Sequence, residues 1–157
     1  MQKITTFLWF NGQAEEAAKF YTSVFKNSKI TSISHYSEAG PMPAGSAMSV
    51  NFELEGQEFI ALNGGPEYSF TPAISLFVNC ESQEEVDALW DKLTEGGGEV
   101  QCGWLEDKYG LSWQIVPSKL MDYLNGKDPK KSARAAQALY QMKKIDLAKI
   151  KQAYEQG

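Results

Sequence analysis

The chain carries one order of predicted secondary structure twice, and this repeat limits its possible folds more than any other feature. Residue patterns predict a strand, a helix and three strands over residues 4–62, and the same order over residues 73–116. A shift of about 69 positions places Tyr21 on Trp90 and matches the apolar positions of the two helices. A chance likeness between two amphipathic helices is the alternative. We therefore expect an α+β fold of two βαβββ modules.

Local signals set the elements of each module. Asn11-Gly12 is a turn that ends the first strand, and the helix after it has alanines and aromatics at helical spacing. Apolar and polar residues alternate over residues 48–54, which indicates a strand with one face on the core. Ser82-Gln-Glu-Glu85 is a capping box that begins the helix of the second module.

Beyond Pro117 the pattern predicts helices only. Asp128-Pro129 and Asp146 are expected helix starts, and each is followed by an apolar stripe. The predicted organisation is a first module at 1–66, a second at 67–117 and a helical tail at 118–157. The tail is rich in lysine, which indicates a solvated face on docked helices, with a partner-binding patch as the alternative.

Charge and cysteine content exclude several classes of protein. The chain has 15 Lys and Arg against 20 Asp and Glu, a formal charge of −5, which argues against a nucleic-acid partner. No apolar stretch approaches the roughly 20 residues that cross a bilayer. Cys80 and Cys102 form no CxxC motif, and free thiols are expected. We expect a soluble, cytoplasmic protein that contacts no membrane.

The residues of common catalytic sites are scarce. His35 is the only histidine, and it lies in a polar stretch near the end of a predicted strand. The chain has no nucleophile elbow and no glycine-rich loop placed to hold a nucleotide. No catalytic residue can be named, no cofactor is expected, and a metal site built on several histidines is excluded.

Polar side chains inside otherwise apolar strands mark a candidate ligand site. Binding cavities combine apolar or aromatic walls with a few polar groups that orient the ligand. The tryptophans could supply the walls, although a tryptophan in a strand is equally compatible with a place in the core. The predicted ligand-binding residues are Thr6, Trp9, Asn63, Ser75, Trp104, Trp113 and Gln114.

Several segments together resemble a known family. They are Phe7-Leu-Trp-Phe-Asn-Gly-Gln-Ala-Glu-Glu-Ala-Ala-Lys-Phe-Tyr21, Leu62-Asn-Gly-Gly-Pro66, Val78-Asn-Cys-Glu-Ser-Gln-Glu-Glu-Val-Asp87 and Cys102-Gly-Trp-Leu-Glu-Asp-Lys-Tyr-Gly-Leu-Ser-Trp-Gln-Ile-Val-Pro117. They are similar to the PhnB-like branch of the glyoxalase/bleomycin-resistance/dioxygenase (vicinal oxygen chelate) superfamily. Members of this branch often carry the label demethylubiquinone 3-methyltransferase.

The resemblance implies paired βαβββ modules whose curved sheets surround a cavity, usually completed in a homodimer. In metal-dependent relatives, His or Glu ligands stand on defined strands, and one Glu follows an Asp-x-x-Gly turn. The turn maps onto Asp107–Gly110 and the Glu onto Gln114, while other ligand positions fall on Thr5 or Thr6 and on Ala73 or Ser75. Hydroxyls and a neutral amide are poor ligands for a divalent ion, so the mapping predicts a metal-free site.

Three functions stay open from the sequence. The first is a metal-free protein that binds an unidentified small molecule, planar or aromatic, in a homodimer. The second is an enzyme, either metal-dependent and of the glyoxalase or dioxygenase type, or a methyltransferase as the label says. The third is an interaction protein whose basic terminal helices bind a partner.

Overall fold

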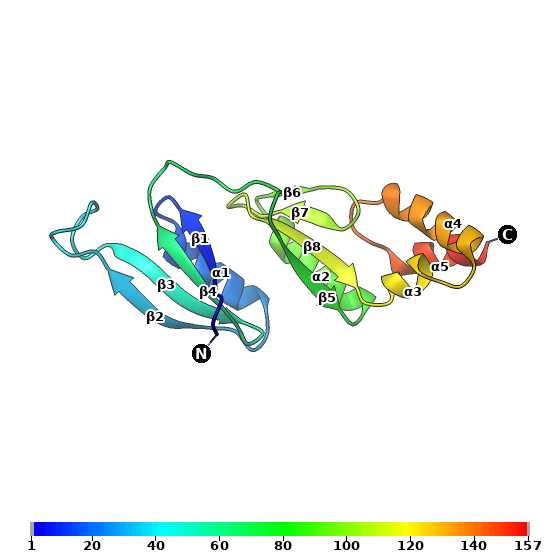
Figure 1. Cartoon of the computed structure of the whole chain (residues 1–157), viewed down its shortest axis with the longest axis horizontal. Helices are drawn as coiled ribbons and strands as arrows, with labels where there is room; N and C mark the ends of the chain where they lie inside the picture. Colours follow the sequence, from blue (N-terminus) through cyan, green and yellow to red (C-terminus); the bar gives the residue numbers. More distant parts are fainter. Residues whose placement is uncertain (1, 157) are drawn as a thin grey trace. The chain divides into compact units, whose positions relative to one another are not determined.

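The computed structural model describes residues 2–156, which divide into two compact units (Figure 1). The division falls between Phe70 and Thr71, and the helical tail belongs to the second unit.

The first unit contains one four-stranded sheet and one helix. The sheet has the order β1-β4-β3-β2, in which β1 and β4 run parallel and the other neighbours are antiparallel. Its elements are β1 (Thr6–Phe10), α1 (Ala14–Val24), β2 (Lys29–His35), β3 (Ala47–Leu54) and β4 (Gln57–Asn63).

The second unit repeats this topology and adds the tail. Its sheet has the order β5-β8-β7-β6, again with the first and last strands of the module parallel. The fold class predicted from the sequence repeat is confirmed. The elements are β5 (Ser75–Cys80), α2 (Gln83–Thr94), β6 (Gly98–Glu99), β7 (Trp104–Glu106), β8 (Ser112–Pro117), α3 (Leu120–Leu124), α4 (Pro129–Tyr140) and α5 (Leu147–Glu155).

Strand β6 is only two residues long. It ends at Glu99, and the chain then turns through Cys102 and Gly103, whose φ angles are 60° and 86°. These left-handed conformations do not continue a strand. The backbone N–H of Gly103 donates to the carbonyl of Lys143 in the tail, at 2.8 Å, and this bond holds the turn.

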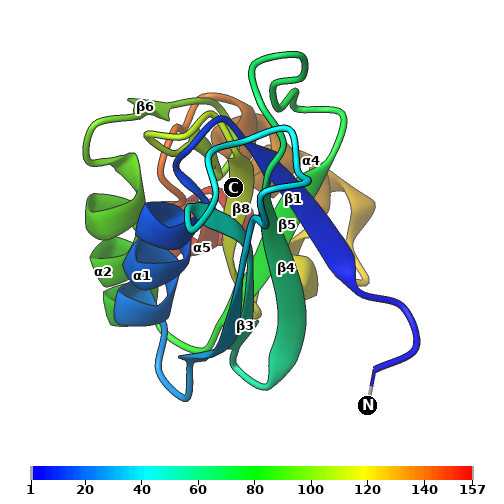
Figure 2. The ribbon, with the colours of Figure 1, turned by 90° about the vertical axis from the view of Figure 1, so that its left-hand side faces the viewer.

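Each sheet buries one face beneath its own helix. In Figure 2, α1 lies to one side of β3 and β4, and α2 lies to one side of β5 and β8. Ala14, Ala17 and Ala18 are fully buried, so the small side chains let α1 approach its sheet closely. Tyr21 of the same helix stacks on Phe52 of β3, with ring centroids 6.2 Å apart.

The tail has a hydrophobic cluster of its own, which reaches the sheet at Val116. Its buried members are Leu120, Ala135, Leu139, Ile145 and Ile150. The predicted helix starts are present: Asp128 accepts hydrogen bonds from the N–H groups of Lys130 and Lys131, and Asp146 from that of Lys149. Both caps satisfy N–H groups that a helix leaves unpaired at its start.

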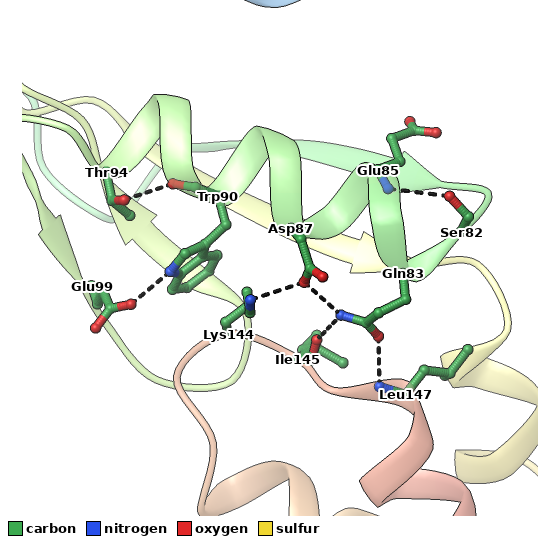
Figure 3. A network of polar contacts seen from close by, with 10 residues as sticks. All are labelled: Ser82, Gln83, Glu85, Asp87, Trp90, Thr94, Glu99, Lys144, Ile145 and Leu147. Atoms are coloured by element: carbon green, nitrogen blue, oxygen red, sulfur yellow. Dashed lines mark hydrogen bonds and ion pairs between the residues drawn. The ribbon is translucent and has the colours of Figure 1, made fainter.

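A polar network joins the tail to α2 (Figure 3). The amide nitrogen of Gln83 donates to the carbonyl of Ile145 at 2.9 Å and to Asp87 at 3.0 Å, and its oxygen accepts from the N–H of Leu147 at 2.7 Å. Lys144 pairs with Asp87 at 2.9 Å. The hydrogen bond from Gln83, and then Lys144, lower the pKa of the Asp87 carboxyl. Gln83 therefore connects the start of α2 with the start of α5.

Within residues 2–156, no helix is long and apolar enough to cross a membrane.

Candidate ligand-binding site

Three of the predicted site residues lie together on the second sheet. The face of this sheet opposite α2 carries Ser75 and Phe77 from β5, Gln114 from β8 and Trp104 from β7, and we call these four residues the open face. Gln114 pairs in register with Phe77 on one side and with Trp104 on the other, so the three side chains form a row across the strands. The row places an amide between two aromatic rings.

A hydrogen bond joins the polar members of the open face. The amide nitrogen of Gln114 donates to the hydroxyl oxygen of Ser75 at 3.0 Å. In the part of the chain that the structure describes, neither the other amide atom, Oε1 of Gln114, nor the hydroxyl hydrogen of Ser75 has a hydrogen-bond partner. Oε1 of Gln114 is therefore available as an acceptor, with the hydroxyl hydrogen of Ser75 and the second amide hydrogen of Gln114 as donors beside it.

The sequence prediction did not include Phe77, although its side chain is 52% exposed. Phe7 of β1 has the corresponding place in the first unit, opposite α1, and is 57% exposed. The two phenylalanines are 70 residues apart, close to the shift that relates the modules. Large aromatic side chains are seldom left this exposed. A phenylalanine at the same position of both modules was therefore the signal in the sequence that could have indicated Phe77.

Trp9 lies in the first unit and contacts the segment after β4. Its indole N–H donates to the carbonyl of Gly65 at 2.9 Å, and its ring meets that of Tyr68 edge to face with centroids 4.9 Å apart. A β-carbon on Gly64 would lie 2.5 Å from the indole, so only glycine fits there.

Thr6, Asn63 and Trp113 lie on the faces that carry the helices. Asn63 is buried, and its side chain accepts from the N–H of Ala14 at 2.8 Å and donates to the carbonyl of Ala47 at 3.0 Å. The amide therefore ties the start of α1 to the sheet. Thr6 pairs with Phe59 beneath α1, and we include none of these three residues in the proposed site.

Trp113 is a core residue, held by the Asp107–Gly110 turn. The ring is 1% exposed, and its N–H donates to Asp107 at 2.8 Å. The other carboxylate oxygen of Asp107 accepts from the N–H groups of Tyr109, at 2.9 Å, and Leu111, at 3.1 Å. Asp107 thus fixes the hairpin that brings β8, and Gln114 on it, beside β7.

A cavity of about 230 Å³ lies at the beginning of β1 in the first unit. Thr5 lines it together with Asn51 and Glu58. Of the two threonines that the family mapping offered on the first strand, Thr5 therefore faces open space and Thr6 faces the helix side.

The residues at the mapped ligand positions do not fit a divalent metal. Gln114 and Ser75 are neutral and bonded to each other, and neither supplies the charge that holds a metal ion against water. Among residues 2–156, no three His, Cys, Asp or Glu side chains gather in a group that could bind one. Both cysteines are free, and burial, ahead of the nearby Glu85, raises the pKa of the Cys80 thiol to about 12.

The two mixed sheets, each with one helix, define the class of the protein, an α+β fold of two βαβββ modules. Within it, residues 2–116 match the family model described as 3-demethylubiquinone-9 3-methyltransferase, and the chain belongs to this family. No curated protein matches the chain.

Solved structures support this assignment. A PhnB protein from Bacillus cereus, described as a 3-demethylubiquinone-9 3-methyltransferase, is 46% identical with a TM-score of 0.69, over 74% of this chain and 99% of its own. A Pseudomonas aeruginosa protein is 21% identical with a TM-score of 0.59, over 72% and 95%. The fosfomycin resistance protein FosX from Listeria monocytogenes, complexed with Mn(II) and sulfate, is 15% identical with a TM-score of 0.52, over 72% and 90%. The last two show the fold alone.

Proposed function

We propose that this protein binds a small molecule without a metal, with the open face as one wall of a cavity completed in a cytoplasmic homodimer. The observation that carries the proposal is the neutral hydrogen bond between Gln114 and Ser75. The family resemblance maps one metal ligand onto Gln114 and another onto Ala73 or Ser75. Aromatic side chains beside a few orienting polar groups are typical of ligand cavities.

Titration of the purified protein with a panel of aromatic metabolites tests binding. Trp104 is the reporter, because a ligand over Gln114 lies against its ring and changes its fluorescence. We expect a saturable change for at least one compound, unaltered by prior dialysis against a chelator and absent in Trp104→Phe. Light scattering should give twice the mass of 17.5 kDa.

Two results contradict the proposal. The absence of a saturable response to any compound would refute ligand binding. Stoichiometric nickel, zinc, iron or manganese that survives dialysis and is needed for the response would refute the metal-free site.

An enzyme is the second candidate, and the name of the matching family favours it. Methyl transfer needs a donor, and the donor of a methyltransferase is commonly a nucleoside sulfonium. The chain has no glycine-rich loop of the kind that holds such a cofactor after a first strand. Equilibrium dialysis with S-adenosylmethionine separates the candidates: measurable binding favours the enzyme, and none favours the binding protein.

A further inference from the structure

The open face presents a specific pattern of hydrogen-bonding groups, and this pattern restricts the ligand. One of the two Nε2 hydrogens of Gln114 bonds to Ser75, and Oε1 remains as an acceptor beside the second Nε2 hydrogen. The Ser75 oxygen accepts that bond, which leaves its own hydrogen to donate. A ligand group that bonds to both Oε1 of Gln114 and the Ser75 hydroxyl offers a donor and an acceptor side by side.

We propose that the ligand is a neutral planar molecule with a cis amide, such as a lactam fused to an aromatic ring. Its N–H donates to Oε1 of Gln114, and its carbonyl accepts from the hydroxyl of Ser75. With the existing bond from Gln114 to Ser75, every donor in the resulting ring of three hydrogen bonds has an acceptor. Hydrogen bonds that form such a closed ring strengthen one another. This inference rests on the proposed binding function and adds the chemical class of the ligand.

The neighbouring strands favour a flat ligand. Phe77 and Trp104 flank Gln114 on either side, and adjacent strands are about 4.8 Å apart, so their Cα atoms are separated by roughly 9.6 Å. The Gln114 side chain lies between the two aromatic side chains, and a ring that meets its amide would have its centre about 5 Å from each of them, within the usual spacing of aromatic pairs. The spacing of the row therefore favours a planar ring.

The charge of the strands disfavours an anion. Strands β5, β7 and β8 contain no Lys or Arg, and Glu106 is their one ionisable side chain apart from Cys80. A carboxylate also lacks the hydrogen that Oε1 of Gln114 needs. A carboxylic acid, ionised at neutral pH, would therefore leave that acceptor unpaired and find no counter-charge on these strands.

Three related compounds test the proposal on the unmodified protein by isothermal titration calorimetry. They are 2-quinolinone, which has both groups, 1-methyl-2-quinolinone, which has lost the donor, and quinoline-2-carboxylate, which is charged. We expect 2-quinolinone to bind at least about tenfold more tightly than its methyl derivative, because an unpaired polar group is costly in a site. The carboxylate should bind more weakly still.

Variants then show which side chains cause the preference for 2-quinolinone over its methyl derivative. In Gln114→Leu and in Ser75→Ala the preference for 2-quinolinone should fall to less than about threefold, whereas Gln137→Leu, at an exposed position on α4, should keep it. Equal affinity for the two quinolinones, or a preference that persists in both site variants, would overturn the inference and leave the binding function standing. Failure of every aromatic compound to bind would overturn both.

Discussion

Replacing Gln83 by leucine should weaken the attachment of the tail to α2 without unfolding the sheet. The change removes both hydrogen bonds to the tail, those with the carbonyl of Ile145 and the N–H of Leu147. Each is worth about 1 kcal/mol net. The third bond goes to Asp87, whose side chain is 45% exposed, so water can replace it. We expect a loss of about 2 kcal/mol, which corresponds to a roughly 30-fold increase in tail opening.

Hydrogen exchange followed by mass spectrometry measures this opening directly. Amides of α5 should exchange about 30-fold faster in Gln83→Leu, while amides of α1, in the other unit, should keep their rates. Gln152→Leu, an exposed position on α5 itself, is the matched control and should leave the exchange unchanged. The Lys144–Asp87 pair is half-exposed and adds less than about 1 kcal/mol. Unchanged exchange of α5 in Gln83→Leu would refute the view that this side chain holds the tail.

Three further predictions concern the second unit. Asp107→Asn should lower the free energy of unfolding by about 2–3 kcal/mol in urea titrations, because an amide cannot supply acceptors to the Trp113 indole and to the turn at once. Gly97→Ala should cost about 2 kcal/mol or more by the same measurement, since a β-carbon there would overlap the Glu106 carbonyl, whereas Gly98→Ala meets open space. Because folding raises the pKa of the Cys80 thiol, stability should be full below about pH 9 and fall as pH rises toward 12. Cys80→Ala should flatten that decline, and an equal decline in both proteins would contradict it.

Much of the fold could be predicted because its signals are local. Turn residues, helix caps and the period of apolar residues depend on near neighbours, and the order of strands and helices that they predict, with helix starts at Asp128 and Asp146, agrees with the structure. The end of the two-residue strand β6 could not be predicted from local signals. It depends on Gly103 and on the hydrogen bond from Gly103 to Lys143, 40 residues further along the chain.

The faces of the strands were harder to predict than the strands themselves. In β1 and β8, apolar residues occupy both faces, so alternation does not distinguish the helix side from the open side. Thr6 and Trp113 could therefore be assigned to either face on sequence alone. Gln114 could be selected as a site residue from the sequence, because a half-buried amide between buried residues in a strand is costly unless it has a partner. Ser75 is that partner.

The parallel pairing of β1 with β4 has a kinetic consequence. Hairpin β3–β4 joins residues close in the chain, but β1 pairs with residues about 53 positions later, and β5 pairs with β8 across about 37. Because long loops close more slowly than short ones, β1 and β5 should join their sheets last. During synthesis, neither strand finds its partner until its module is almost complete. The strands that carry Phe7 and Phe77 are therefore the last to become ordered in their modules.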